Sequence, residues 1–113
     1  MNQVVVKQEK SGYQIVEAYK SLRTNLQFCG EDKKEIAVTS CTPNEGKSSV
    51  SMQLGISLAE SGKRVILIDA DLRKSVLLGR TKTQKSVRGL AHFLSGQATL
   101  EDVICSTNVK NFY

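Results

Sequence analysis

Apolar residues in the first third of the chain recur at helical spacing. They fall at intervals of four, three and four positions, at Ile15, Tyr19, Leu22 and Leu26. This single apolar stripe predicts an amphipathic helix over residues 14–28, and Gly30 is placed to end it. Ahead of it, residues 3–8 alternate loosely, which predicts a short strand or an extended arm.

The middle of the chain has the pattern of one βαβ unit. A short apolar run predicts a strand over 35–40, a helix should follow over 47–60, and Gly62 should close that helix. Residues 64–69 form a second, continuously apolar run, which is typical of a parallel strand covered on both faces. Such a strand–helix–strand connection is expected to be right-handed.

Two shorter helices and a further strand are predicted in the last third. The first helix should lie near 87–95, where Ser95–Gly96 breaks it, and the second near 99–105, with Thr99 as its N-cap. An apolar run begins at residues 111–113, where a third strand is expected. Because two parallel strands leave open edges and uncovered faces, the 113 residues are expected to be the front part of a larger domain.

Composition narrows the class of protein without choosing a function. The net charge is +5, but the basic residues are scattered and are not interleaved with aromatic ones, so we expect no nucleic-acid partner. The sequence has no transmembrane run. Three cysteines without CxxC spacing, Cys29, Cys41 and Cys105, predict free thiols in a reducing compartment, and the single His92 is not expected to bind a metal.

Residues 41–48, Cys-Thr-Pro-Asn-Glu-Gly-Lys-Ser, fit a phosphate-binding P-loop in all but the first glycine. Backbone N–H groups of such a loop wrap the phosphates, and the start of the following helix adds N–H donors and a positive dipole. Lys47 is expected to reach the β- and γ-phosphates of ATP, and Ser48 to ligate Mg²⁺. The predicted nucleotide-binding residues are Thr42, Pro43, Asn44, Glu45, Gly46, Lys47, Ser48 and Ser49.

A pair of carboxylates follows the second predicted strand. Asp69 and Asp71 stand at its carboxyl end, where open α/β sheets bind their ligands. Two carboxylates beside a triphosphate require a cation between them. Asp69 and Asp71 are therefore predicted, with Ser48, to hold Mg²⁺.

These two motifs together resemble the bacterial tyrosine kinases of capsule and exopolysaccharide synthesis, the CpsD/CapB group. The loop TSCTPNEGKSS and the run from Asp69 to Arg73 look like that group's Walker A and Walker A′ motifs. The helix with Glu17, Lys20 and Arg23 is similar to its N-terminal E-x-x-R-x-x-R helix, with Lys20 in place of the first arginine. Residues 89–96 resemble the stretch after Walker A′, so the resemblance covers roughly residues 14–105.

The resemblance implies a fold and a function. The fold would be a three-layer α/β P-loop NTPase of the MinD/ParA-like kind, with a mainly parallel sheet that is incomplete at its C-terminus. Residues 1–113 would be the N-terminal part of one kinase domain, with an arm and oligomerisation helix in 1–30 and a nucleotide-binding core in 35–113. The activity would be autophosphorylating tyrosine kinase chemistry with ATP and Mg²⁺, regulating capsular or exopolysaccharide synthesis.

Further roles follow from the same resemblance. Lys47, Asp69 and Asp71 would be catalytic, and the two aspartates would serve the metal and the incoming tyrosine hydroxyl. Glu17, Lys20 and Arg23 would lie at a subunit contact of a ring-type oligomer. A separate membrane adaptor would recruit the kinase through its cytoplasmic tail, which implies a cytoplasmic location at the inner face of the membrane.

The chain departs from the family pattern in two ways. The Walker B aspartate of a later strand and a tyrosine cluster are both absent from the 113 residues, so little or no kinase activity is expected of this chain. Two alternatives stay open. One is a MinD/ParA-type ATPase, which Thr42 disfavours because those proteins carry lysine there; the other is a regulatory fragment that binds nucleotide without turnover.

Overall fold

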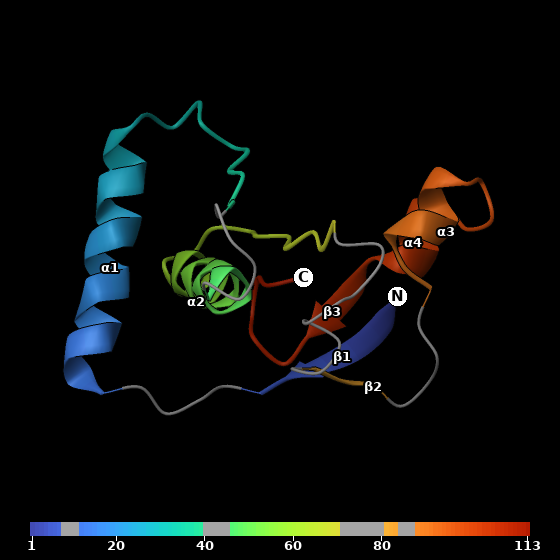
Figure 1. Ribbon diagram of the computed structural model, residues 1–113, viewed down its shortest axis with the longest axis horizontal. Helices are drawn as coiled ribbons and strands as arrows, with labels where there is room; N and C mark the ends of the chain where they lie inside the picture. Colours follow the sequence, from blue (N-terminus) through green and yellow to red (C-terminus); the bar gives the residue numbers. More distant parts are fainter. Residues whose placement is uncertain (8–11, 40–45, 71–80, 84–87) are drawn as a thin grey trace.

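Both ends of the chain contribute strands to the sheet. The structure is a computed structural model, and it describes residues 1–7, 12–39, 46–70, 81–83 and 88–113. Strand β1 (Asn2–Val6) lies between β2 (Thr81–Thr83) and β3 (Cys105–Thr107) (Figure 1). The β1–β2 pair is antiparallel and the β1–β3 pair is parallel. The predicted N-terminal strand is therefore confirmed, whereas the expectation of a helix up to residue 105 is wrong, because Cys105 begins a strand.

Helix α1 (Tyr13–Phe28) confirms the first predicted helix almost to the residue. Gly30 has a φ of 119°, a left-handed conformation that ends the helix as the sequence predicted. No residue of α1 is buried. The apolar stripe is only partly covered, and Figure 1 shows α1 standing at one side of the molecule beside α2.

Helix α2 (Lys47–Glu60) has the predicted bounds, and Gly62 closes it. The Gly62 N–H donates to the Ala59 carbonyl and the Lys63 N–H to the Leu58 carbonyl, which together form a Schellman motif. This motif needs a left-handed residue after the helix, and Gly62 supplies it with a φ of 96°. The helix is the most buried element of the described chain, because one of its faces supplies much of the core.

A second, shorter parallel ladder joins residues 65–67 to residues 111–113. The Val65 and Leu67 N–H groups donate to Asn111 and Tyr113 carbonyls, and the Tyr113 N–H donates back to Val65. This pairing confirms that a strand-forming run begins at 111. It amounts to a single bridge, Val65 with Phe112, rather than a full strand over 64–69.

Two predictions about the middle strands are wrong in detail. Residues 35–39 form no strand in the described structure, and residue 40 lies outside the described residues. Residues 64–69 are not covered on both faces: exposure alternates along them, and Ile66 and Ile68 face outward. The reason is that helix α2 covers only one face of this segment, so side chains of the other face stay exposed.

The last two helices are shorter than predicted. Helix α3 spans Leu90–Leu94 rather than 87–95, and α4 spans Leu100–Val103 rather than 99–105. Thr99 is confirmed as the N-cap of α4. Its hydroxyl accepts from the Asp102 N–H at 3.3 Å, and the Asp102 carboxylate accepts from the Thr99 N–H at 3.0 Å.

The hydrophobic core lies between α2 and the two ladders. Its buried members are Val6, Met52, Ile56, Ala59 and Phe112. Val65, Leu67 and Val109 pack against this cluster from its edge. The α/β class is thereby confirmed, with parallel β1–β3 and 65–112 pairings, although the antiparallel β2 makes the sheet mixed.

Candidate nucleotide-binding site

The junction between Gly46 and helix α2 is the described part of the predicted P-loop. Gly46 is the N-cap of α2 and has a φ of 82° and a ψ of 15°, a left-handed conformation that glycine adopts without steric cost. Lys47 is the first helical residue. The backbone therefore turns sharply into the helix at the position where the motif requires a glycine next to the lysine.

The first turn of α2 suits an anion. The first backbone bond of the helix runs from the Val50 N–H to the Gly46 carbonyl at 2.9 Å, so the helical ladder does not use the N–H groups of Lys47 and Ser48. Neither an acidic residue nor a side-chain cap occupies this turn. The positive end of the helix dipole is consequently not offset by a carboxylate from within the helix.

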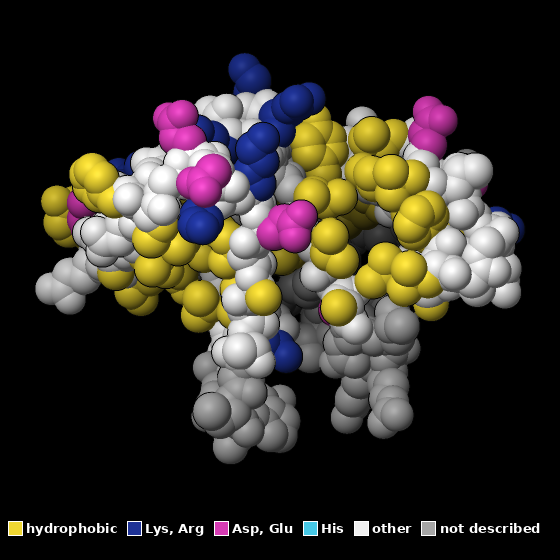
Figure 2. Space-filling view, turned by 90° about the horizontal axis from the view of Figure 1, so that it is seen from above, with side chains coloured by type: hydrophobic (Ala, Val, Ile, Leu, Met, Phe, Trp, Pro, Cys, Tyr) yellow, Lys and Arg dark blue, Asp and Glu magenta, His cyan; other side chains and the backbone are white. Residues whose placement is uncertain are grey.

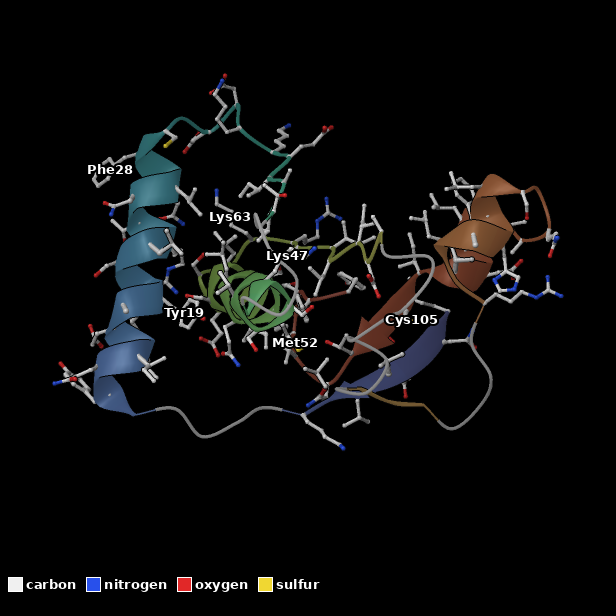
Figure 3. All side chains as sticks on the ribbon, in the orientation of Figure 1. Tyr19, Phe28, Lys47, Met52, Lys63 and Cys105 are labelled. Atoms are coloured by element: carbon white, nitrogen blue, oxygen red, sulfur yellow. The ribbon has the colours of Figure 1, made fainter. Side chains whose placement is uncertain are left out.

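The side chains of this turn differ in their exposure to solvent. Lys47 is exposed, and Ser48 and Ser49 are half-buried (Figure 3). The Ser51 hydroxyl, one turn further on, donates to the Lys47 carbonyl at 2.7 Å. The remaining predicted loop residues, Thr42, Pro43, Asn44 and Glu45, lie outside the described residues, as does Cys41.

Of the two predicted carboxylates, the structure describes one. Asp69 is half-buried and follows the Val65–Leu67 ladder, while Asp71 lies outside the described residues. Val65 and Leu67 pack against the core cluster to which α2 contributes. The segment carrying Asp69 and the helix carrying Lys47 therefore contribute to one hydrophobic core, and Figure 1 shows the segment passing beside α2.

The three residues predicted for a subunit contact, Glu17, Lys20 and Arg23, make different contacts on α1. Glu17 and Lys20 pair with each other at 3.5 Å on the solvent side. Arg23 turns toward α2, where its Nη1 donates to the Ser57 carbonyl at 2.9 Å and to the Ser57 hydroxyl at 3.3 Å. A turn later, Gln27 Nε2 donates to the Ser61 hydroxyl at 3.5 Å.

Arg23 thus ties α1 to α2, a contact that the sequence did not predict. A signal was available, because Arg23 lies four residues after Tyr19 and three before Leu26, on the half-buried side of the helix. The side chain of Ser57 is buried, so the arginine also supplies a partner for a polar group that water does not reach.

Residues described by the structure contain no group of three or more His, Cys, Asp or Glu side chains placed to hold a metal ion. Asp71, one of the predicted ligands, is outside that set. None of the described helices is long and apolar enough to cross a membrane.

Comparison with known proteins assigns the chain to a family. Residues 33–113, which include the predicted P-loop and both aspartates, match the model of the AAA domain. The chain belongs to the AAA domain family. The match covers the part of the chain that the sequence predicted to be the nucleotide-binding core and leaves α1 and β1 outside.

Curated relatives extend the match toward the N-terminus. The chain is 47% identical over 93 residues to the tyrosine-protein kinase CpsD of Streptococcus agalactiae, which covers 82% of this chain and 41% of that protein. It is 43% identical over 97 residues to the tyrosine-protein kinase CpsD of Streptococcus pneumoniae serotype 4, covering 86% and 43%. A tyrosine-protein kinase of Bacillus subtilis, YwqD, is 36% identical over 97 residues, covering 84% and 40%.

These matches confirm the resemblance to the CpsD group of tyrosine kinases. The chain spans about two fifths of the length of the curated relatives that it matches. More than half of each of those kinases therefore has no counterpart in the matched segment.

Proposed function

We propose that the chain binds ATP with Mg²⁺ and supplies the phosphate-binding part of a protein-tyrosine kinase. The observation that carries this proposal is the left-handed Gly46 leading directly into Lys47 at the start of α2. That geometry suits the Gly-Lys-Ser of a P-loop, in which backbone N–H groups and a lysine hold the phosphates. The names of the curated relatives supply the reaction class.

The residues present fit a magnesium nucleotide. Lys47 would neutralise charge on the β- and γ-phosphates, and the hydroxyl of Ser48 would ligate Mg²⁺ together with Asp69 and Asp71. A magnesium ion held by these residues would supply charge neutralisation at the phosphates. Thr42, Pro43, Asn44, Glu45, Gly46 and Ser49 complete the proposed phosphate loop.

The proposed acceptor is a tyrosine hydroxyl, which Asp69 or Asp71 would orient. Of two carboxylates at i and i+2, one can bind the metal while the other accepts the proton of the tyrosine hydroxyl. Because phosphoryl transfer depends on positioning and charge stabilisation, the absence of a Walker B aspartate from the sequence predicts weak transfer.

Assembly and location are part of the same proposal. The complete fold would be a three-layer MinD/ParA-like domain, and Glu17, Lys20 and Arg23 would take part in ring-type self-association. A membrane adaptor of polysaccharide synthesis would recruit the kinase at the inner face of the plasma membrane. Two relatives are named as putative kinases of a cps region and as EpsB, which supports a role in capsule or exopolysaccharide production.

Single-turnover transfer from γ-labelled ATP tests the kinase proposal. We expect the 113-residue chain to bind Mg-ATP but to transfer little or no label to tyrosine, alone or with a peptide acceptor. Robust tyrosine phosphorylation by this chain would show that the missing metal ligand is not needed. Binding without any transfer, even after addition of the C-terminal part of a relative, would indicate a nucleotide-binding module instead.

A further inference from the structure

The three tyrosines of the chain differ in how accessible they are to another protein. Tyr19 is half-buried, on the side of α1 that faces α2 (Figure 3). Tyr113 is also half-buried, and its backbone is held in the C-terminal ladder by bonds to Val65 and Leu67. Tyr13 is the exposed one, with 79% of its surface open to solvent. A protein that acts on a tyrosine hydroxyl of this chain therefore reaches Tyr13 most easily.

The position of Tyr13 in α1 explains its exposure. It is the first residue of the helix and follows Gly12, which has extended backbone. Long side chains in helices lean toward the helix N-terminus, so the ring of a first residue projects past the helix and has no preceding turn to lie on. A Cβ atom added at Gly12 would meet no described atom within 4 Å, so the space beside this end of the helix is open.

The start of α1 can also open locally at little cost. No residue of α1 is buried, and its first backbone bonds run from the Ile15 and Val16 N–H groups to the Gly12 carbonyl, both at 3.1 Å. Breaking these bonds frees the first turn without uncovering the hydrophobic core, which lies on the other side of α2. An active site that surrounds the ring of Tyr13 would therefore meet little resistance from the rest of the molecule.

The other strongly exposed aromatic residue of α1 is Phe28, which is 84% exposed at the opposite end of the helix. Figure 2 looks onto that end, and hydrophobic side chains lie among polar ones at its surface. Phenylalanine has no hydroxyl, so its exposure marks apolar surface and not a site of modification. Only Tyr13 combines an exposed position on α1 with a phenolic O–H group.

We propose that Tyr13 is a phosphoacceptor, which a complete kinase of the kind named among the curated relatives phosphorylates in trans. The Tyr13 Oη attacks the γ-phosphorus of ATP, and the new Oη–P bond replaces the bond from that phosphorus to the β,γ-bridging oxygen. ADP leaves with this oxygen, and the phenolic proton passes to a base of the kinase. The proposal rests on the proposed function for its reaction class, but this chain acts in it as the acceptor and needs no catalytic site of its own.

A phosphate on Tyr13 would change the charge at the start of α1. That turn has no acidic residue and no side-chain cap on Gly12, whereas phosphotyrosine carries about −1.5 to −2 charges at neutral pH. Negative charge at a helix N-terminus is stabilising, so amide exchange at Ile15 and Val16 should slow about twofold to fivefold on phosphorylation at low salt. High salt should reduce this difference, because it screens the charge. Faster exchange after phosphorylation would contradict this effect.

The decisive experiment uses the full 113-residue chain as substrate for the complete Streptococcus agalactiae kinase with γ-labelled Mg-ATP. Once the kinase has labelled itself, peptide mass spectrometry locates the label on the chain. We expect it on Tyr13. Tyr13→Phe keeps the ring and should abolish labelling of the chain, whereas Tyr19→Phe, the matched control on the same helix, should leave it unchanged.

Two results would overturn the proposal. One is a self-labelled kinase with an unlabelled chain, and the other is label that persists on the chain in Tyr13→Phe. Calorimetry with Mg-ATP on the same preparation of the chain reports on its own nucleotide site. A chain that is labelled on Tyr13 but does not bind Mg-ATP would contradict the proposed function and leave the acceptor site standing.

Discussion

Gly55 is the residue at which the packing of α2 on the C-terminal ladder leaves least room. A Cβ atom added there would lie 2.7 Å from Cε2 of Phe112, whose side chain is buried in the core. We expect Gly55→Ala to lower the free energy of unfolding by about 1 kcal/mol, because overpacking outweighs the better helix propensity of alanine. Urea unfolding monitored by circular dichroism measures this loss.

Two further variants isolate the cause of that loss. Gly12→Ala should change the unfolding free energy little, because nothing lies within 4 Å of the added Cβ. In a Phe112→Leu background, which removes the ring edge, the cost of Gly55→Ala should shrink or change sign. An undiminished cost in that background would mean that the Phe112 ring is not what limits the site.

Cysteine reactivity gives a second prediction for individual residues. Burial raises the pKa of the Cys105 thiol, whereas Cys29 is exposed. A raised pKa leaves less thiolate at a given pH, so at pH 8 iodoacetamide should alkylate Cys29 several-fold faster than Cys105. The gap should narrow as pH rises through the pKa of Cys105. Peptide mass spectrometry follows both sites, and equal rates in the folded protein would contradict the burial of Cys105.

At the scale of elements, Arg23 makes the shortest side-chain hydrogen bond between α1 and α2, to the Ser57 carbonyl at 2.9 Å. Arg23→Ala removes the bonds to Ser57 and leaves that buried hydroxyl without its charged donor. We expect a loss of about 1 kcal/mol or more in unfolding free energy and faster amide hydrogen exchange along α1. Hydrogen exchange with mass spectrometry resolves the helix from the rest of the chain.

Lys20→Ala is the matched control for that change. Lys20 lies one turn earlier and makes only an exposed pair with Glu17, so its removal should cost less than about 0.5 kcal/mol. If Arg23→Ala instead altered only the oligomeric state, with unchanged exchange in α1, its role would be in subunit contact alone.

The helices were predictable because local signals define them. Helix α2 begins after Gly46 and ends before Gly62, and both glycines have the positive φ that their positions require. Thr99 likewise identified the start of α4 through its capping box. The bounds of α1 and α2 could therefore be predicted from the sequence. Helices α3 and α4 are shorter than predicted, and neither has a buried residue that would anchor further turns.

The strands were less predictable because pairing is not local. Strand β3 at Cys105–Thr107 exists because it lies beside β1, a hundred residues earlier in the sequence, and no periodicity within three residues announces it. The side chain of Asn108 extends this ladder by bonding the N–H and carbonyl of Val6. Residues 35–39 carry strand-forming side chains, yet a strand requires a neighbour to pair with it.

For the candidate site, the sequence predicted which residues bind phosphate, and the structure describes the backbone at Gly46 and the first turn of α2. The order Gly46, Lys47, Ser48 already predicted a phosphate loop, and the left-handed Gly46 agrees with it. The direction of Arg23 toward Ser57 could not be predicted, because the relative placement of two helices depends on tertiary packing. The proposed reaction class rests on the names of the relatives rather than on the geometry of the helix start.

At the scale of the whole molecule, the account rests on one claim: the turn into α2 binds the phosphates of ATP with Mg²⁺. Isothermal calorimetry with Mg-ATP on the 113-residue chain and on Lys47→Ala tests it most directly, with Lys63→Ala, at the other end of α2, as the control. We predict binding by the parent and by Lys63→Ala, and a loss of about tenfold or more in affinity for Lys47→Ala, which removes the charge that faces the β- and γ-phosphates. No binding by a parent chain shown to be folded, or equal binding by all three proteins, would contradict the account.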